Sequence, residues 1–178
     1  MTLNYTLSEK DYLEYYLHNY SNSEQSGKKF IRSYILVILI ALIGTVFGLI
    51  NKNSELSIAM GLWLVITIVF YPKYYRFQIR KHYERHIKEN YSSRLGINIK
   101  LEFKDDHLFT QNHSGESKTL YSAIEQIQET PNLFLIKLGP SLAYIVPKSQ
   151  LENLDSMRNK LSQLGLKVVP TKSNKWVE

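Results

Sequence analysis

The sequence predicts an α+β membrane protein, in which a two-helix transmembrane hairpin precedes a small antiparallel β-domain closed by a C-terminal amphipathic helix. Two uncharged apolar blocks, residues 34–50 and 56–71, stand in the first half of the chain. From Gly96 onward apolar and polar residues alternate, which is typical of half-buried strands. Near the end, residues 151–164 return to helical spacing of their apolar residues.

Composition limits the remaining possibilities. The 178 residues carry a formal net charge of +6 and contain no cysteine. A membrane hairpin leaves enough chain for one small soluble domain and a short N-terminal segment. The lack of cysteine excludes disulfides, thiolate zinc sites and cysteine nucleophiles, and it fits a domain in the cytoplasm.

Each apolar block, extended by its flank, approaches the ~20 residues that a helix needs to cross a bilayer. We therefore expect a hairpin over residues 29–75, with spans at about 32–50 and 56–75. The link of residues 51–55 is so short that the spans must be antiparallel neighbours. The alternative, two buried helices of a soluble bundle, predicts a polar stripe that neither block has.

The charges that flank the blocks predict the orientation. Lys28, Lys29 and Arg32 precede the first block, whereas the link contains one Lys and one Glu. The positive-inside rule then places both termini in the cytoplasm of a multi-pass protein of the cell membrane. Six further cations follow the second block and are candidate contacts for anionic lipid headgroups, unless they serve only to set the topology. They are Lys73, Arg76, Arg80, Lys81, Arg85 and Lys88.

Small residues predict where the two spans meet. Gly44 and Gly48 form a GxxxG step, and Ser57 and Gly61 form a similar step at the start of the second block. Small side chains let helix backbones approach closely in a membrane. We expect these four residues to pack the spans together in the outer leaflet, the alternative being the seam of a homodimer.

Two helical segments flank the hairpin. Residues 1–28 are expected to form an amphipathic helix and a polar linker, with Thr6 and Glu9 at capping-box spacing. Its tyrosine stripe either anchors at the membrane surface or packs on the β-domain. After Pro72, which should kink or restart the second helix, residues 76–95 predict a basic juxtamembrane helix.

The β-domain is expected over residues 96–170. An alternating strand at 97–103 is followed by turns at Asp105–Asp106 and His113–Gly115. Ser149 and Glu152 have capping-box spacing before the final helix, and Gly165 is a good stop. This pattern suggests a pleckstrin-homology-like barrel or half-barrel. Further short strands are expected at 117–121, 124–129, 133–138, 142–146 and 166–169, with a hairpin at 139–141 and a polar tail at 171–178.

Several residues of this domain carry a family resemblance. They are Phe103 with Asp105 or Asp106, then Tyr121, Ile124, Ile127, Glu129, Phe134-Leu135 and the run YIVPK at 144–148. On these residues and on the order of its parts, the chain resembles the YcxB-like family of bacterial membrane proteins. It departs from the family where Tyr121 replaces a frequent Trp and where Leu151 replaces an aromatic residue. The resemblance implies the fold and the topology, but no catalytic role or ligand.

The search for catalytic motifs finds no phosphate-binding loop, Rossmann glycine pattern or nucleophile elbow. His82 and His86 lie one helical turn apart, but Glu84 is on another face and a third zinc ligand is not evident. The pair Asp105–Asp106 is expected to form a turn. No partner histidine is evident for the turn-region serines, and we expect no catalytic residue, metal or cofactor. These serines are Ser114, Ser117, Ser122 and Ser141.

The leading hypothesis is therefore a non-enzymatic, membrane-anchored cytoplasmic binding module that holds an unidentified protein at a strand edge or in the groove beside its final helix. Exposed apolar residues between 121 and 138 are expected to make the contact. Alternatives are an immunity-type protein that neutralises a toxin, a sensor of anionic lipids, and a membrane-associated enzyme using His82 and His86. We expect the bilayer as a partner and no nucleic acid, and a homo-oligomer stays open.

Overall fold

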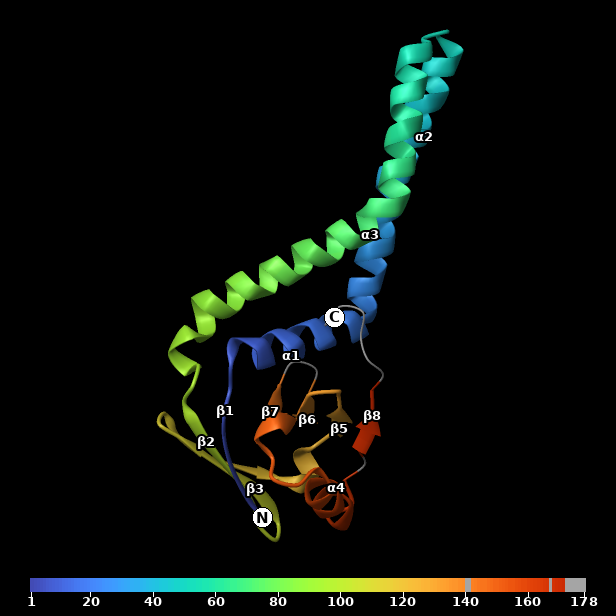
Figure 1. Cartoon of the computed structure of the whole chain (residues 1–178). Helices are drawn as coiled ribbons and strands as arrows, with labels where there is room; N and C mark the ends of the chain where they lie inside the picture. Colours follow the sequence, from blue (N-terminus) through green and yellow to red (C-terminus); the bar gives the residue numbers. More distant parts are fainter. Residues whose placement is uncertain (140–141, 167, 172–178) are drawn as a thin grey trace. The chain divides into compact units, whose positions relative to one another are not determined.

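The computed structural model describes residues 1–139, 142–166 and 168–171. The fold is α+β, with two mainly antiparallel sheets and two long apolar helices (Figure 1). The chain divides into two compact units. We call Met1–Asn19 together with Tyr83–Glu178 the β unit, and Tyr20–His82 the hairpin unit.

The first sheet of the β unit is fully antiparallel and has the order β1-β2-β3-β4. Its first strand was not predicted, because residues 2–6 are too few to show a period and pair with β2 far along the chain. The Asp105–Asp106 turn between β2 and β3 is confirmed. The strands are β1 (Thr2–Thr6), β2 (Asn98–Phe103), β3 (His107–Asn112) and β4 (Gly115–Leu120).

The second sheet has the order β7-β6-β5-β8, and only β8 runs parallel to its neighbour, β5. A short 3₁₀ turn, η2 (Tyr121–Ala123), carries the chain from the first sheet to the second. The predicted series of short strands is therefore divided between two sheets. The strands are β5 (Gln126–Glu129), β6 (Leu133–Lys137), β7 (Ala143–Pro147) and β8 (Val168–Pro170).

The core of the β unit is centred on β6. Four successive residues of this strand are fully buried, so both of its faces are covered. In β2 and β3 only alternate residues are buried, and for β2 the alternating sequence predicted this. The final helix α4 (Leu154–Gln163) contributes Met157 and Leu161 to the core. The four buried residues of β6 are Leu133, Phe134, Leu135 and Ile136.

Helix α1 (Glu9–Asn22) packs within the β unit through the face that carries its tyrosines. Tyr12, Leu13 and Leu17 are buried there, so packing on the β-domain is the observed alternative. The expected Thr6–Glu9 capping box is wrong, because Thr6 is paired in β1. Instead the backbone N–H and hydroxyl of Ser8 both donate to Asp11 Oδ2, at 2.8 and 2.6 Å.

The hairpin unit consists mainly of α2 (Glu24–Ile50) and the first part of α3 (Ser54–Tyr91). Both helices are long and apolar enough to cross a membrane, judged by length and composition. The expected polar break at 21–27 is nearly absent, since Ser23 alone separates α1 from α2. Pro72 lies inside α3, which continues as a helix on both sides of it.

Helix α4 begins later than expected. Asn153 caps it by accepting bonds from the backbone N–H groups of Asp155 and Ser156, and Ser149 instead lies in the 3₁₀ turn η3 (Lys148–Gln150). The expected Ser149–Glu152 capping box is therefore wrong. Gly165 ends the helix with φ of 69°, as predicted. Residues 140–141 of the predicted hairpin, residue 167 and residues 172–178 of the predicted tail lie outside the described residues.

Candidate functional site

The predicted helix-packing residues are only partly brought together. A Cβ placed on Gly48 would lie 2.6 Å from Ser57 Oγ and 2.8 Å from its backbone nitrogen, so α2 and α3 touch closely there. Gly44 instead faces Met60, whose side chain would lie 3.0 Å from such a Cβ. Gly61 has nothing within 4 Å, because the α3 face that meets α2 passes through Ser57 and Met60 and leaves Gly61 at its border.

The base of the hairpin unit is an aromatic cluster formed by α2 and α3. The ring centroids of Phe30 and Tyr75 are 5.0 Å apart, and those of Tyr34 and Tyr71 are 5.6 Å apart. Tyr20 Oη also lies 2.9 Å from Tyr75 Oη. These contacts bring the cations at the start of α2 close to the cations that follow the apolar part of α3.

The six cations predicted for lipid contact lie along α3 and do not form a single stripe. Four of them belong to the hairpin unit, and Arg85 and Lys88 belong to the β unit. Lys73, Arg76 and Lys81 are exposed, whereas Arg80 is half-buried. Lys88 Nζ lies 3.7 Å from Glu9 Oε1, so this cation contributes to packing α3 on α1 within the β unit.

A second aromatic cluster ties α1 to the last turns of α3 within the β unit. Tyr16 Oη donates to Tyr91 Oη at 2.6 Å, and the Tyr16 ring stacks on Tyr83 with centroids 5.2 Å apart. Burial and the hydrogen bond from Tyr16 to Tyr91 raise the pKa of Tyr16. His86 packs edge-on against Tyr16. In the described part of the chain, no group of three potential metal ligands surrounds His82 or His86.

Two polar residues of α1 are buried against the second sheet. Glu14 accepts bonds of 2.8 Å from the Thr130 hydroxyl and from Asn132 Nδ2, in the turn between β5 and β6. His18 Nε2 lies 2.9 Å from Gln128 Oε1 on β5. Burial lowers the pKa of His18 despite the bond to Gln128. This pair sets the register of α1 on the sheet.

An ion triad joins β5, the 3₁₀ turn η3 that follows β7, and α4. Glu129 accepts a bond of 2.8 Å from Lys148 Nζ and a short bond of 2.5 Å from an Arg158 terminal nitrogen. The bonds from Arg158 and Lys148 lower the pKa of Glu129. Lys148 also lies 5.0 Å from the centre of the Phe134 ring. Most residues of the family resemblance therefore belong to the core or to the ion triad. Asp105 and Asp106 are instead exposed in a turn, and Tyr121 Oη donates to the Lys104 carbonyl at 2.7 Å.

The β-domain is the part of the chain that is similar to a known protein family. Residues 103–161 match the model of the YcxB-like protein family. No curated protein and no solved structure matches the chain. The YcxB-like stretch includes Glu129, Lys148 and Arg158, the whole ion triad, and it runs from β2 to α4. The predicted resemblance is thus confirmed over this stretch.

The expected apolar contact surface between residues 121 and 138 is wrong. Ile124, Ile127 and the apolar residues of β6 are buried, because the second sheet uses them for its core. The large apolar side chains that stand exposed in the described part of the YcxB-like stretch are Leu120 and Leu142.

Strand β4 pairs with no strand on its outer side among the described residues, although its Thr119 hydroxyl lies 2.8 Å from the Tyr144 hydroxyl of β7. It lies at the end of the first sheet, and all of its residues except Thr119 are exposed. Asn112 and Gly115 flank a two-residue turn and form a hydrogen-bonded pair, so bonding alternates along the hairpin. Glu116 and Lys118 therefore direct their backbone groups away from β3.

The edge of β1 is partly closed. The side chain of Gln150 accepts from Thr6 N and donates to Thr6 O, at 2.9 and 2.8 Å. Beside it lies the predicted groove next to the final helix, of about 310 Å³, between β1 and residues 150–156. Its lining is mainly polar and includes one acidic residue, Glu152.

The remaining candidates lie in turns. Asp106 Oδ1 accepts a 2.6 Å bond from His107 Nδ1, which lowers the pKa of this exposed carboxyl. Ser114 Oγ lies 3.3 and 3.2 Å from the two ring nitrogens of His113, a proximity that sequence reasoning missed. The other serines are dispersed: Ser117 is in β4, Ser122 is in η2, and Ser141 lies outside the described residues.

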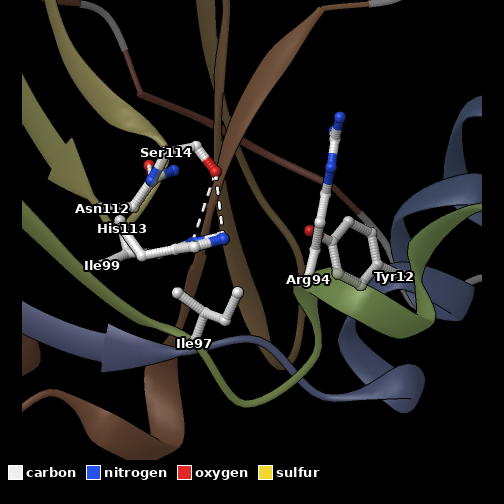
Figure 2. Close-up of a pocket in the computed structure, with 7 residues that line it drawn as sticks. All are labelled: Tyr12, Arg94, Ile97, Ile99, Asn112, His113 and Ser114. Carbon is white, nitrogen blue, oxygen red and sulfur yellow. Dashed lines mark hydrogen bonds between the residues drawn. The ribbon is translucent and has the colours of Figure 1, made fainter.

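A pocket of about 300 Å³ lies beside the His113–Ser114 turn (Figure 2). Its lining comes from α1, the turn before β2, β2 itself and the β3–β4 turn, all of which belong to the β unit. It contains no acidic side chain. The lining residues are Tyr12, Arg94, Ile97, Ile99, Asn112, His113 and Ser114.

Proposed function

We propose that this chain is a membrane-anchored binding module, whose hairpin crosses the cell membrane and holds the β unit at the cytoplasmic face. One observation carries the anchor. Only 11% of the apolar stretch of α2 and 6% of that of α3 are buried, whereas a core helix of a soluble protein is mostly buried. A bilayer would cover this exposed apolar surface.

The base of the hairpin unit supports the orientation. Tyr34, Tyr71 and Tyr75 cluster there with Phe30, and tyrosine favours the interface between lipid and water. Lys28, Arg32 and Lys73 lie within a turn or so of the same cluster along their helices. We infer that this end faces the cytoplasm and that both termini lie there.

For the β unit we propose a pleckstrin-homology-like half-barrel. Two four-stranded sheets and one terminal helix support it, as does the bond of 2.8 Å between the hydroxyls of Thr119 on β4 and Tyr144 on β7, which links edge strands of the two sheets. We propose a non-enzymatic role, since most residues of the family resemblance serve the core and the ion triad.

The proposed binding element is the outer edge of β4. Exposed backbone N–H and C=O groups on an edge strand can pair with an extended segment of a partner protein. Glu116 and Lys118 present opposite charges on this edge, which would select the register of that segment.

The anchor and its orientation are tested with single cysteines, because the chain has none of its own. Lys52→Cys places a thiol in the α2–α3 loop, and Lys10→Cys places one on the exposed side of α1. A membrane-impermeant maleimide applied to intact cells should label position 52 alone, and both positions after lysis. Labelling of position 10 in intact cells contradicts the orientation. Lysed cells are the control, because both thiols must react with the maleimide there.

The edge strand is tested with a photocrosslinking residue at position 116 of the full-length protein in its native membrane. We expect a discrete crosslinked partner that Lys118→Pro abolishes, because proline removes an outward N–H while leaving the β3–β4 bonds in place. Lys118→Ala is the matched control for loss of the charge, and it should retain the crosslink. A crosslink that survives Lys118→Pro rules out pairing at this edge.

Contact with anionic lipids is a second role that a specific observation favours. An open groove of about 490 Å³ runs along one side of α2, with cations at one end and apolar side chains along the rest. This arrangement suits a phospholipid whose headgroup meets the cations and whose chain follows the helix. The lining residues are Lys28, Ile31, Arg32, Ile35, Leu36 and Leu39.

A further inference from the structure

The pocket beside the β3–β4 turn is a concave surface of mixed chemistry within the β unit. Figure 2 shows His113 and Ser114 on one side of it and Arg94 with Tyr12 on the other, with Ile97 between them. Four separate segments of the chain therefore converge on one small volume.

Arg94 makes the pocket cationic. Its guanidinium lies 5.5 Å from the centre of the Tyr91 ring, so its position is supported from one side by an aromatic face. Among the described residues, Arg94 forms no ion pair, and the pocket lining contains no carboxylate. A guanidinium without an acidic partner retains its N–H groups for a bidentate bond to a carboxylate or phosphate.

The opposite side supplies hydrogen-bond donors. The backbone N–H of Ser114 is already taken by Asn112 Oδ1, at 2.8 Å. The Ser114 hydroxyl and the His113 ring are hydrogen-bonded to each other, with Oγ 3.3 and 3.2 Å from the two ring nitrogens. The hydroxyl can rotate toward an oxygen anion in place of the ring, and the Asn112 amide nitrogen can donate to the same anion. Donors on one side and a cation on the other are the arrangement that an anionic group needs.

The floor of the pocket is apolar. Ile97 and Ile99 are half-buried and Tyr12 is buried, so a ligand would remove apolar surface from water there. A volume of about 300 Å³ is at the lower limit for small-molecule sites. It suits a compact apolar group joined to a single anionic group, rather than an extended chain.

We propose that this pocket binds a small organic anion, whose phosphate or carboxylate is held by Arg94 and by the donors of His113 and Ser114, and whose apolar part lies on Ile97 and Ile99. The proposal does not depend on partner binding at the β4 edge, and it holds whether or not the hairpin spans a membrane.

The test uses the full chain in a non-ionic detergent, with isotope-labelled isoleucine methyl groups and phenyl phosphate as the probe. We expect saturable shifts of the Ile97 and Ile99 methyl signals, with a dissociation constant of about 1 mM or lower. Arg94→Gln should weaken binding roughly tenfold or more. Arg94→Lys should weaken it less, because lysine keeps the positive charge but cannot form the two parallel bonds of a guanidinium. Lys10→Gln, which removes an exposed charge elsewhere, should leave binding unchanged.

Two further probes separate the parts of the site. Inorganic phosphate should bind more weakly than phenyl phosphate, and Ile97→Ser should weaken phenyl phosphate but not inorganic phosphate. Phenylacetate, the anion of phenylacetic acid, should compete with phenyl phosphate, since both present an oxygen anion. The proposal is overturned if Ile97 and Ile99 do not shift, or if Arg94→Gln and Lys10→Gln bind alike while the isoleucine spectrum shows that both are folded.

Discussion

Glu14 and His18 lie four positions apart on α1, and both are buried against the second sheet. Helical spacing predicts that they share a face, and the buried tyrosines and leucines around them indicate the core side. Their acceptors and donors, on Gln128, Thr130 and Asn132, are more than a hundred residues away. The sequence therefore indicates that the two residues share a face but not which residues they bond, because partners at that separation are brought together only by packing.

His18 predicts a pH dependence of stability. Its pKa is lowered in the folded protein by burial, with Lys137 lowering it further and Gln128 and Glu14 opposing. The unfolded chain, with a histidine pKa of about 6.5, then binds more protons than the folded one. The free energy of unfolding should fall as pH drops below about 6.5, by at most ~1.4 kcal/mol per pH unit for this one proton.

Thermal unfolding of the full protein in detergent between pH 8 and 5, followed by circular dichroism, measures this slope. Acidification should leave Glu129 ionised in this range, since its pKa is lowered. His18→Gln keeps a hydrogen-bonding group toward Gln128 and should flatten the slope. Equal slopes in the two proteins would assign the pH dependence to other groups.

Among the secondary-structure elements, the α2–α3 pair shows how a motif is refined by helix geometry. GxxxG spacing indicated Gly44, Gly48, Ser57 and Gly61 together. The observed contact is centred on Gly48 and Ser57, and Met60 rather than Gly61 faces Gly44. A spacing of four turns the helix by about 40° more than one full turn, so the second residue of such a pair can lie at the border of the contacting face, as Gly61 does.

A matched pair of substitutions tests that contact. Gly48→Ala places a Cβ against the backbone of Ser57 and should destabilise the hairpin by about 1–3 kcal/mol. Gly61→Ala meets open space and replaces glycine within a helix, so it should be neutral or slightly stabilising. Unfolding of the full protein in detergent, titrated with a denaturing detergent, measures both. Equal effects would show that Gly48 is not the point of closest approach.

The same reasoning explains the strands. Alternation correctly predicted β2, because one face of the first sheet is covered and the other is not. Turn chemistry correctly predicted the turn at Asp105–Asp106. It misplaced the surface of β6, since a central strand covered on both faces carries no alternation. β1 was missed because its pairing with β2 spans almost a hundred residues.

For the whole molecule, the proposed anchor predicts that the cations of the hairpin unit favour anionic lipids around the protein. Lys73→Gln, Arg76→Gln and Lys81→Gln together should reduce the preference of the reconstituted protein for anionic over zwitterionic lipid. The expected loss is on the order of 1 kcal/mol per cation at low salt, and it should shrink as salt rises.

Lipid preference is measured from the phospholipids that copurify with the protein from mixed nanodiscs. The matched control removes three charges from the β unit, as Lys10→Gln, Lys100→Gln and Lys160→Gln, and it should retain the preference. A similar loss in both triple variants would mean that net charge alone, and not the base of the hairpin, selects the lipid.

The sequence by itself determined the order of the parts, the two long apolar helices, most of the strands of the YcxB-like stretch and the stop at Gly165. These features follow from local periodicity and turn chemistry, which neighbouring residues carry. The tertiary structure alone decided that α1 packs on the β-domain, that β1 opens the first sheet, that Glu129 meets Lys148 and Arg158, and that Arg94 faces a pocket. Each of these brings together residues far apart in the chain, and no local pattern encodes such a distance.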